Sequence, residues 1–296
     1  SKSYLTVLDR FFDDHPEYKI VHVHQDCLSS IILKVAEGHG VPVRIAHSHS
    51  ANQDKNLKYP IKLWYKRNIP KYATNLFACG RDAGDWMFGG TPYQIINNAI
   101  DAVAYTYSPL KRTEKRRELG LATEFVVGHV GRFNQPKNHP FLLAIFAVLL
   151  KKEPNATLLL VGGGEDMPKM QAKARELGIA DHVRFLGVRS DVADLMQAMD
   201  VFAFPSLYEG LPVTMVEAQA AGLPCIISDK VPPECILTEG LVDVMPLSAG
   251  AEAWADAILE KRNTPRTDRR TEIAAHGFDI TTEAVKLQEF YLEAYK

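Results

Sequence analysis

The feature that most constrains this sequence is a regular alternation of short apolar runs with amphipathic stretches. The apolar runs are rich in β-branched residues and are typical of buried parallel strands, at 18–24, 41–48, 75–80, 93–100, 124–132, 156–164, 182–187, 201–206, 224–228 and 241–246. The stretches between them have helical periodicity, at 28–38, 58–72, 81–88, 139–151, 168–177, 191–199, 213–221 and 251–260. Strand–helix alternation with short connections predicts an α/β fold with two Rossmann-like parallel-sheet domains.

A polar, basic stretch at about 101–121 separates two series of strands and predicts a domain boundary with a hinge. We expect an N-terminal domain over 1–110, a second domain over 111–271 and a C-terminal helix over 272–296. That helix either caps the second sheet or crosses back onto the first domain. The chain opens within a helical pattern rather than a strand, so we expect the first βαβ unit of the N-terminal domain to lie outside this sequence.

Composition narrows the class of protein. The 296 residues are 46% hydrophobic and 24% charged, which is ordinary for a globular protein, and the net charge of −2 argues against a nucleic-acid partner. The basic run at 111–117 is interpreted as a solvated charged face. No signal peptide and no apolar run of 18 residues is visible, so a cytoplasmic location is expected. Buried, reduced thiols are predicted for the four cysteines, Cys27, Cys79, Cys225 and Cys235.

The segment YEGLPVTMVEAQAAGLP at 208–224 places two acids eight residues apart, Glu209 and Glu217. Pro212 suits the first turn of a helix and Gly222 suits its end, so Glu209 precedes the helix and Glu217 lies in its second turn. A carboxylate beside a helix start can accept hydrogen bonds from ribose or sugar hydroxyls. The alternative is that both acids only complement the helix dipole.

With its flanking strands, this segment resembles family 4 of the GT-B glycosyltransferases, in the capsular and exopolysaccharide branch. The matching signature is a pair of Glu separated by seven residues, within PSLYEGLPVTMVEAQAAGLPCI. The resemblance implies an acceptor domain followed by a nucleotide-sugar donor domain. It implies that Glu209 faces the donor sugar as a catalytic residue and that Glu217 holds the ribose hydroxyls. The loop before the helix is expected to bind the donor through Gly210, Leu211 and Pro212, since its free N–H groups favour an anion.

A second element follows the strand at 124–132, where Lys137 comes five residues after Gly131-Arg132. Two fixed cations stabilise the charge that develops on a departing pyrophosphate, although an isolated Arg and Lys in a loop are more often surface charges. The family's Gly-Arg…Lys pattern matches Gly131, Arg132 and Lys137, and implies that they bind the donor diphosphate. No Asp-x-Asp motif occurs in the sequence. These cations are therefore expected to replace a metal, and no cofactor is predicted.

Three glycines at 162–164 also follow a strand. They allow the backbone to approach a ligand closely, or they form a plain strand–helix turn. The resemblance implies that this turn, with Gly163, passes near the nucleotide. It also implies that the backbone of Val188 and Arg189 pairs with the edge of the base.

In the first domain, HVHQD at 22–26 and AHSHS at 46–50 end two strands, the edge where open parallel sheets bind ligands. The two histidines of an HxH pair point to one side of a strand but supply only two ligands. Zinc needs a fuller set, so no metal site is predicted. In the family a His at a strand end contacts the donor sugar near the reacting centre. His24 is assigned this catalytic role, with His22 as the alternative.

The resemblance implies retaining transfer of a sugar from a nucleoside diphosphate donor, with UDP expected, to a hydroxyl of a growing polysaccharide or lipid-linked glycan. No second carboxylate is placed as a nucleophile, so a front-face route is favoured over double displacement. Peripheral contact with the inner face of the membrane is expected. The alternatives are a nucleotide-sugar 2-epimerase of the same fold, a hydrolase using the two acids of the signature, and a non-catalytic nucleotide-sugar-binding subunit. The family's Gly-rich loop after its first strand has no counterpart in this sequence.

Overall fold

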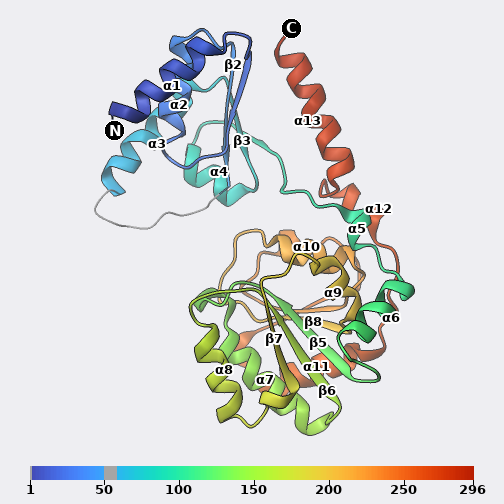
Figure 1. Cartoon of the computed structure of the whole chain (residues 1–296). Helices are drawn as coiled ribbons and strands as arrows, with labels where there is room; N and C mark the ends of the chain where they lie inside the picture. Colours follow the sequence, from blue (N-terminus) through green and yellow to red (C-terminus); the bar gives the residue numbers. More distant parts are fainter. Residues whose placement is uncertain (1, 50–58) are drawn as a thin grey trace. The chain divides into compact units, whose positions relative to one another are not determined.

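The computed structural model describes residues 2–49 and 59–296 (Figure 1). These residues form two compact units. The first holds the described residues up to Asn98 together with Thr281–Lys296, and the second holds Ala99–Ile280. Each unit contains one sheet whose paired strands all run parallel, which confirms the predicted α/β class with two parallel sheets.

The first unit is built on a sheet of strand order β1-β2-β3-β4. The strands are β1 (Ile20–Val23), β2 (Val43–Ser48), β3 (Asn75–Ala78) and β4 (Gln94–Ile95). The helices that follow or precede them are α1 (Lys2–Asp14), α2 (Ser29–Gly38), α3 (Tyr59–Tyr72) and α4 (Arg81–Phe88). The strand predicted at 93–100 is reduced to β4, whose two residues are exposed at the edge of the sheet. An edge strand has a neighbour on one side only, so little holds it in register.

One face of the first sheet is covered by the last helix, α13 (Ile280–Ala294). Its apolar residues Leu287, Phe290 and Tyr291 pack on a buried cluster of strand residues, Val43, Ile45 and Phe77. The apolar residues that the sequence shows at helical spacing in this segment therefore form a packing face for the first unit.

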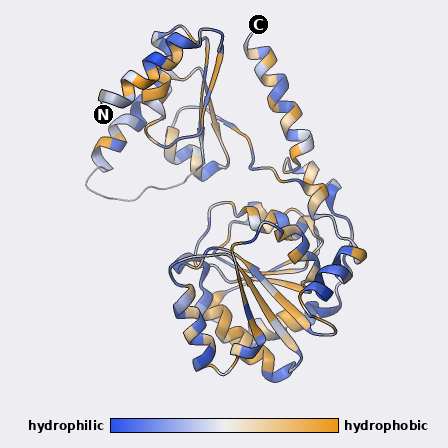
Figure 2. Cartoon of the chain, in the orientation of Figure 1, coloured by the Kyte–Doolittle hydropathy of each residue, from blue (hydrophilic) through white to orange (hydrophobic). Residues whose placement is uncertain are grey.

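The second unit is built on a sheet of strand order β10-β9-β8-β5-β6-β7. Its strands are β5 (Phe125–Val130), β6 (Ala156–Val161), β7 (Val183–Gly187), β8 (Val201–Phe204), β9 (Cys225–Ser228) and β10 (Val242–Met245). The helices between them are α7 (His139–Lys152), α8 (Met167–Glu176), α9 (Val192–Ala198) and α10 (Val213–Ala220), and α11 (Gly250–Glu260) and α12 (Arg270–Ala275) follow the last strand. The central strands are apolar along their length, as Figure 2 shows, because helices bury both faces of the sheet.

The stretch predicted as a hinge at 101–121 belongs to the second unit and carries two helices, α5 (Ala102–Tyr105) and α6 (Pro109–Glu118). The division between the units lies at 98/99, before the predicted boundary at 110/111. The interpretation of the basic run 111–117 as a solvated face is wrong for two of its members, since Lys115 and Arg116 are each only 8% exposed. Buried cations require partners, and both residues have them.

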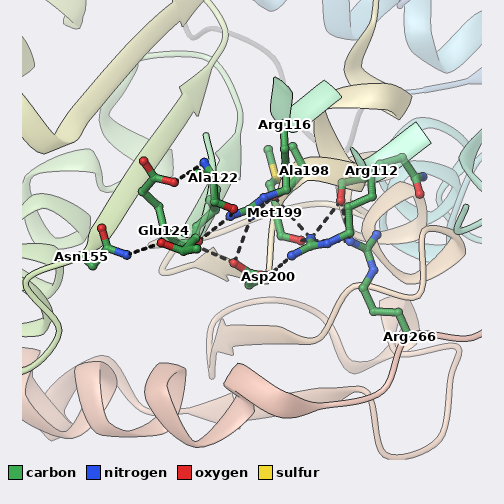
Figure 3. A network of polar contacts seen from close by, with 12 residues as sticks. Arg112, Arg116, Ala122, Glu124, Asn155, Ala198, Met199, Asp200 and Arg266 are labelled. Atoms are coloured by element: carbon green, nitrogen blue, oxygen red, sulfur yellow. Dashed lines mark hydrogen bonds and ion pairs between the residues drawn. The ribbon is translucent and has the colours of Figure 1, made fainter. Parts of the chain in front are cut away.

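A polar network anchors α6 to the amino end of β8 (Figure 3). Asp200 accepts hydrogen bonds from Arg112 at 2.5 Å and from the backbone N–H of Val126 at 2.7 Å, and pairs with Arg116 at 3.5 Å. Arg266 lies in the same network and donates to the carbonyl oxygen of Met199 at 2.9 Å. Burial lowers the pKa of Arg266 to about 9. The network therefore joins α6, the second sheet and the segment after α11.

All four cysteines are free and buried, which confirms the prediction of buried thiols. Burial raises the pKa of the Cys225 thiol. A buried thiol of raised pKa is a poor nucleophile, so these residues act as small apolar side chains.

Candidate functional site

The carboxyl ends of β5 and β8 lie where the strand order of the second sheet changes direction. From β5 the chain continues to β6 and β7 on one side, and then returns to β8, on the other side of β5. Open parallel sheets bind ligands in the crevice at such a switch point. The loops that leave these two strands, 131–138 and 205–212, carry most of the residues predicted for the site.

Two hydrogen bonds join these loops directly. The backbone N–H of Leu207 donates to the carbonyl oxygen of Pro136 at 2.8 Å, and the side-chain amide of Asn138 donates to that of Pro205 at 3.0 Å. Asn138 has φ 55° and ψ 41°, a left-handed conformation that Asn tolerates better than most residues. The loops are thus fixed to one another by contacts that the sequence did not indicate.

The centre of the site is an ion pair between Lys137 and Glu209. The Lys137 ammonium nitrogen lies 2.6 Å from Glu209 Oε1, and the two side chains are only 17% and 11% exposed. The ammonium also lies 4.8 Å from the centre of the Phe204 ring. The sequence predicted both residues in the site but in separate roles. In this structure each neutralises the other.

Gly131 leaves room for this lysine. A Cβ at Gly131 would lie 3.2 Å from Lys137 Cδ and 2.9 Å from the Nε2 atom of His129. His129 is fully buried, its Nδ1 lies 2.9 Å from the carbonyl oxygen of Ala203, and burial lowers its pKa well below the usual value. A neutral ring therefore lies beneath the loop, which leaves the positive charge of the site to Lys137 and its neighbour Arg132.

Arg132 is exposed, next to Gly131 at the end of β5. Within residues 2–49 and 59–296, its guanidinium has no ion-pair or hydrogen-bond partner that would compete with a ligand. It is therefore the cation of this site that is available to an incoming anion without displacing a carboxylate.

The glycine turn at 162–164 lies against the same loop. Gly162 has φ +136° and Gly164 has φ +155°, conformations that other residues rarely adopt. A Cβ at Gly162 would lie 2.1 Å from the carbonyl oxygen of Gly131, and one at Gly164 would lie 2.4 Å from that of Phe133. The glycines are needed because two backbone segments touch here.

Gly163, Val188 and Arg189, which were predicted near the nucleotide, differ in their contacts and exposure. A Cβ at Gly163 would meet only a side-chain methyl group of Val188, at 2.9 Å, so this glycine is less constrained than its two neighbours. Val188 is exposed after β7. The Arg189 side chain donates two hydrogen bonds to Asp191, both at 2.7 Å. The guanidinium of Arg189 is therefore engaged by Asp191, whereas the side chain of Val188 has no such partner and is open to solvent.

Glu217 lies in the second turn of α10, as predicted. The hydroxyl of Tyr105 donates to its Oε1 at 2.7 Å. Burial raises the pKa of Glu217, and the hydrogen bond from Tyr105 opposes that shift. Tyr105 comes from α5, in the stretch predicted as a hinge, so sequence reasoning missed it. Neither Glu209, which is ion-paired in a loop, nor Glu217 lies in the first turn, where complementing the helix dipole would place it.

The loop 210–212 leads into α10, with Pro212 at the N-cap. Pro212 is buried and Gly210 is exposed. In the part of the chain that the structure describes, the backbone N–H groups of Gly210 and Leu211 have no hydrogen-bond acceptor. These groups, with the start of the helix, are suited to bind an anion.

In the first unit, His22, His24, His47 and His49 gather at the carboxyl end of β1 and β2. His22 Nε2 lies 3.1 Å from His47 Nδ1, and His24 Nδ1 lies 2.8 Å from His49 Nε2. Burial, reinforced by the neighbouring rings, lowers the pKa of His22 to about 4 and that of His47 to about 3. Each HxH pair supplies two nitrogen ligands from its own strand, as the sequence predicted, and the pairing of β1 with β2 brings the two pairs together. The sugar-contact role assigned to His24 stays a prediction.

The second unit matches a family model, and both units have relatives along their length. Residues 124–261 match the family described as Glycosyl transferases group 1. EpsF of Bacillus subtilis, named as a glycosyltransferase, is 35% identical over 286 residues, which span 93% of this chain and 74% of EpsF. The UDP-Gal:alpha-D-GlcNAc-diphosphoundecaprenol alpha-1,3-galactosyltransferase of Escherichia coli is 24% identical over 294 residues, which span 94% of this chain and 76% of that protein. The crystal structure of HepE from Anabaena in complex with UDP superposes with a TM-score of 0.80 at 21% identity, covering 97% of this chain and 82% of HepE.

Proposed function

This chain belongs to the group 1 glycosyltransferases and has the GT-B fold, and from that premise we propose that it moves a sugar from UDP to a hydroxyl of a growing polysaccharide or a lipid-linked glycan, with retention. Membership of this family argues against the three alternatives to sugar transfer, which are a nucleotide-sugar 2-epimerase, a hydrolase and a non-catalytic subunit. The observation that carries the proposal is the Lys137–Glu209 ion pair at the switch point of the second sheet, where Lys137 shares a loop with Arg132, whose guanidinium has no partner among the described residues. The E. coli relative is named for a UDP-galactose donor and a diphosphoundecaprenol-linked acceptor, which supports the same classes of ligand here.

Each part of the donor is assigned to groups of the second unit. The diphosphate lies against Arg132 and Lys137 and receives hydrogen bonds from the N–H groups of the loop before α10. Glu217 accepts from the ribose hydroxyls and Glu209 faces the sugar. The remaining donor contacts come from the loop residues Gly131, Gly163, Val188, Arg189, Gly210, Leu211 and Pro212.

The reaction breaks the bond between the anomeric carbon and the diphosphate oxygen while the acceptor oxygen bonds to that carbon on the same face. The acceptor's hydroxyl proton passes to the departing diphosphate oxygen. Fixed cations lower the barrier because negative charge grows on the diphosphate as the bond breaks. Glu209 is held by Lys137, so it is not a free nucleophile, and this supports the front-face route. His24 of the first unit is proposed to contact the sugar near the reacting carbon.

The proposal is tested by calorimetric titration of the full chain with UDP, GDP and ADP and with the corresponding glucose nucleotides. Binding of UDP and UDP-glucose in preference to the others is the expected result. Failure of every nucleoside diphosphate to bind at about millimolar concentration, equivalent to less than about 4 kcal/mol of binding free energy, would contradict the proposal.

The two acids of the signature are expected to separate in a binding experiment. Glu217→Ala should weaken UDP and the UDP-sugar equally, by about tenfold, because both ligands carry the ribose whose hydroxyls lose a buried acceptor. Glu209→Ala should weaken only the UDP-sugar, again by about tenfold. Free UDP should bind Glu209→Ala as well as it binds the wild type, or better, because Lys137 then has no competing carboxylate.

Glu176→Ala is the matched control for these variants, since Glu176 pairs with Lys173 on the surface and should change neither affinity. Thermal melts beside each titration detect a loss of fold. Equal losses of free UDP affinity in Glu209→Ala and Glu217→Ala would show that the two roles are assigned wrongly.

We also propose that the first unit touches the membrane surface through α3. No helix in the described ranges is both long enough and apolar enough to cross a bilayer. Helix α3 exposes Ile61 (59%) and Trp64 (63%), and it also exposes the basic residues Arg67 and Lys71. Exposed apolar and aromatic residues on a basic helix are typical of segments that lie in the headgroup region.

Co-sedimentation with lipid vesicles tests this contact. The chain should bind phosphatidylglycerol-containing vesicles more tightly than pure phosphatidylcholine vesicles, because basic residues add about 1 kcal/mol each near an anionic surface. Trp64→Ala should weaken binding by about tenfold, because the variant lacks the large ring that the wild type would bury among the lipid headgroups. Leu110→Ala, which removes an equally exposed apolar residue from the second unit, should have no effect. Equal binding to both kinds of vesicle would exclude this surface.

A further inference from the structure

We propose that the histidine cluster of the first unit is a binding site for one divalent transition-metal ion of the zinc class, with His22, His24 and His47 as ligands and His49 as the fourth. The inference goes beyond sugar transfer and does not depend on it. It rests on residues that are brought together by the fold of the first unit alone.

The parallel register of β1 and β2 explains why four imidazoles share one face. His22 is paired with Ile45 and Val23 with Ala46, so the next alternate positions are His24 on one strand and His47 on the other. Because side chains alternate along a strand, both HxH pairs project to the same side. The rings stack, with centroids 4.2 Å apart for His22 and His24 and 4.2 Å apart for His47 and His49.

The nitrogen atoms lie close enough together for several of them to reach one metal ion. One ring nitrogen from each of His22, His24 and His47 lies within 4.8 Å of the other two. Zinc bound tetrahedrally at about 2.0–2.1 Å would separate its nitrogen ligands by about 3.4 Å. Two nitrogen–nitrogen distances in the cluster, 3.1 Å between His22 and His47 and 2.8 Å between His24 and His49, are slightly shorter than that separation. Small rotations of the rings therefore suffice to admit an ion.

The chemical state of the cluster favours metal binding. Only a neutral imidazole has a lone pair to give to a metal ion, and four imidazole rings meet here on one face of the sheet. The buried Nε2 atom of His47 has no hydrogen-bond partner among the described residues. An all-imidazole set suits zinc, nickel and copper rather than magnesium or calcium, which prefer oxygen.

A second residue fixes the orientation of one ligand. The hydroxyl oxygen of Tyr291, from α13, lies 2.5 Å from His22 Nδ1. If Nδ1–H donates to this oxygen, the lone pair of Nε2 is directed into the cluster, which is the usual arrangement of a metal-binding histidine and its partner. The Phe77 ring packs edge-on against His22 and His47, with centroids 5.6 and 6.0 Å away, and limits how far the two rings can turn.

The test is a titration of the full chain with zinc against a chromophoric chelator, followed by cobalt(II) as a spectroscopic substitute. We expect one saturable site per chain and the strong visible absorption of four-coordinate cobalt. His24→Gln and His49→Gln, at exposed positions, and His47→Asn should each weaken zinc binding by about tenfold or more, and Tyr291→Phe should weaken it by about tenfold. Thermal melts establish that each variant is folded.

His39→Gln is the matched control. His39 lies 3.1 Å from Asp9 and 3.3 Å from Asp13, so it is the rival place for an ion in the same unit, and its loss should leave the affinity unchanged. Three results would overturn the proposal: no saturable binding below about 100 μM free zinc, unchanged affinity in both His24→Gln and His47→Asn, or a loss confined to His39→Gln.

A zinc ion in this cluster and the donor sugar of the proposed reaction would both need His24. Zinc should therefore inhibit transfer by the wild type, and a chelator should reverse the inhibition. The metal titration needs no donor, and the nucleotide titrations need no metal, so each proposal can fail without the other.

Discussion

Replacing Lys137 with alanine is expected to lower the rate of UDP release from the donor sugar by about 10²–10³-fold, with a smaller effect on KM. The ammonium is fixed in a mostly buried position at the switch point, where negative charge is proposed to grow on the departing diphosphate. A cation held in place stabilises the transition state more than it stabilises the bound donor. The substitution should therefore lower kcat more than it raises KM. Steady-state measurement of UDP release over a range of donor concentrations separates the two constants.

A second effect of this substitution has to be separated from the first. Removing Lys137 leaves Glu209 mostly buried without its cation, and that alone could disturb the loop. The double variant Lys137→Ala/Glu209→Gln removes the uncompensated charge. Activity that returns in the double variant would assign the loss to the stranded carboxylate and contradict the role of the ammonium. Lys173→Ala, which breaks a 2.9 Å surface pair with Glu176, should retain wild-type rates.

Replacing Asp200 with alanine is expected to lower the free energy of unfolding by about 3–5 kcal/mol, the range for removing one partner of a buried ion pair. The carboxylate accepts from Arg112 and from the N–H of Val126, and it neutralises part of a cluster that also contains Arg116 and Arg266. Without it, three buried or half-buried guanidinium groups face one another with no carboxylate between them. Urea denaturation followed by tryptophan fluorescence measures the change.

Asp256→Ala gives the comparison for this prediction. Asp256 pairs with Lys152 at 2.5 Å but is 51% exposed, so its loss should cost less than about 1 kcal/mol. Asp200 lies before β8, at the opposite end of the strand from the donor loops, so UDP affinity in folded Asp200→Ala should be unchanged. A loss of stability no larger than that of Asp256→Ala would mean that the network contributes nothing beyond a surface pair.

The regular part of the fold could be predicted because it depends on local pattern. Strands β5 and β6 are buried along almost all of their length, so each appears as a continuous apolar run, and α10 is delimited by Pro212 and Gly222. The left-handed φ of +61° at Gly222 is the conformation that ends a helix and favours glycine. The signature acids were identified for the same reason, since their spacing and flanking strands lie within one short segment.

The rest depends on contacts between distant residues, which leave no trace in a local pattern. Lys115 is buried because it pairs with Asp191, 76 residues away, and nothing in the run 111–117 distinguishes it from a solvated lysine. The partners Lys137 and Glu209 are 72 residues apart. The histidine cluster was missed because the register of β1 on β2, and not either HxH motif, brings four rings together.

The packing of α13 on the first sheet has a consequence for the order of events on the ribosome. Synthesis proceeds from the amino terminus, so every residue of the second unit is made before Leu287, Phe290 and Tyr291 emerge. Until then the face formed by Val43, Ile45 and Phe77 is uncovered in the nascent chain. The unit that is translated first is therefore the last to be completed, and its apolar face is open to chaperones or to other nascent chains throughout the translation of its neighbour.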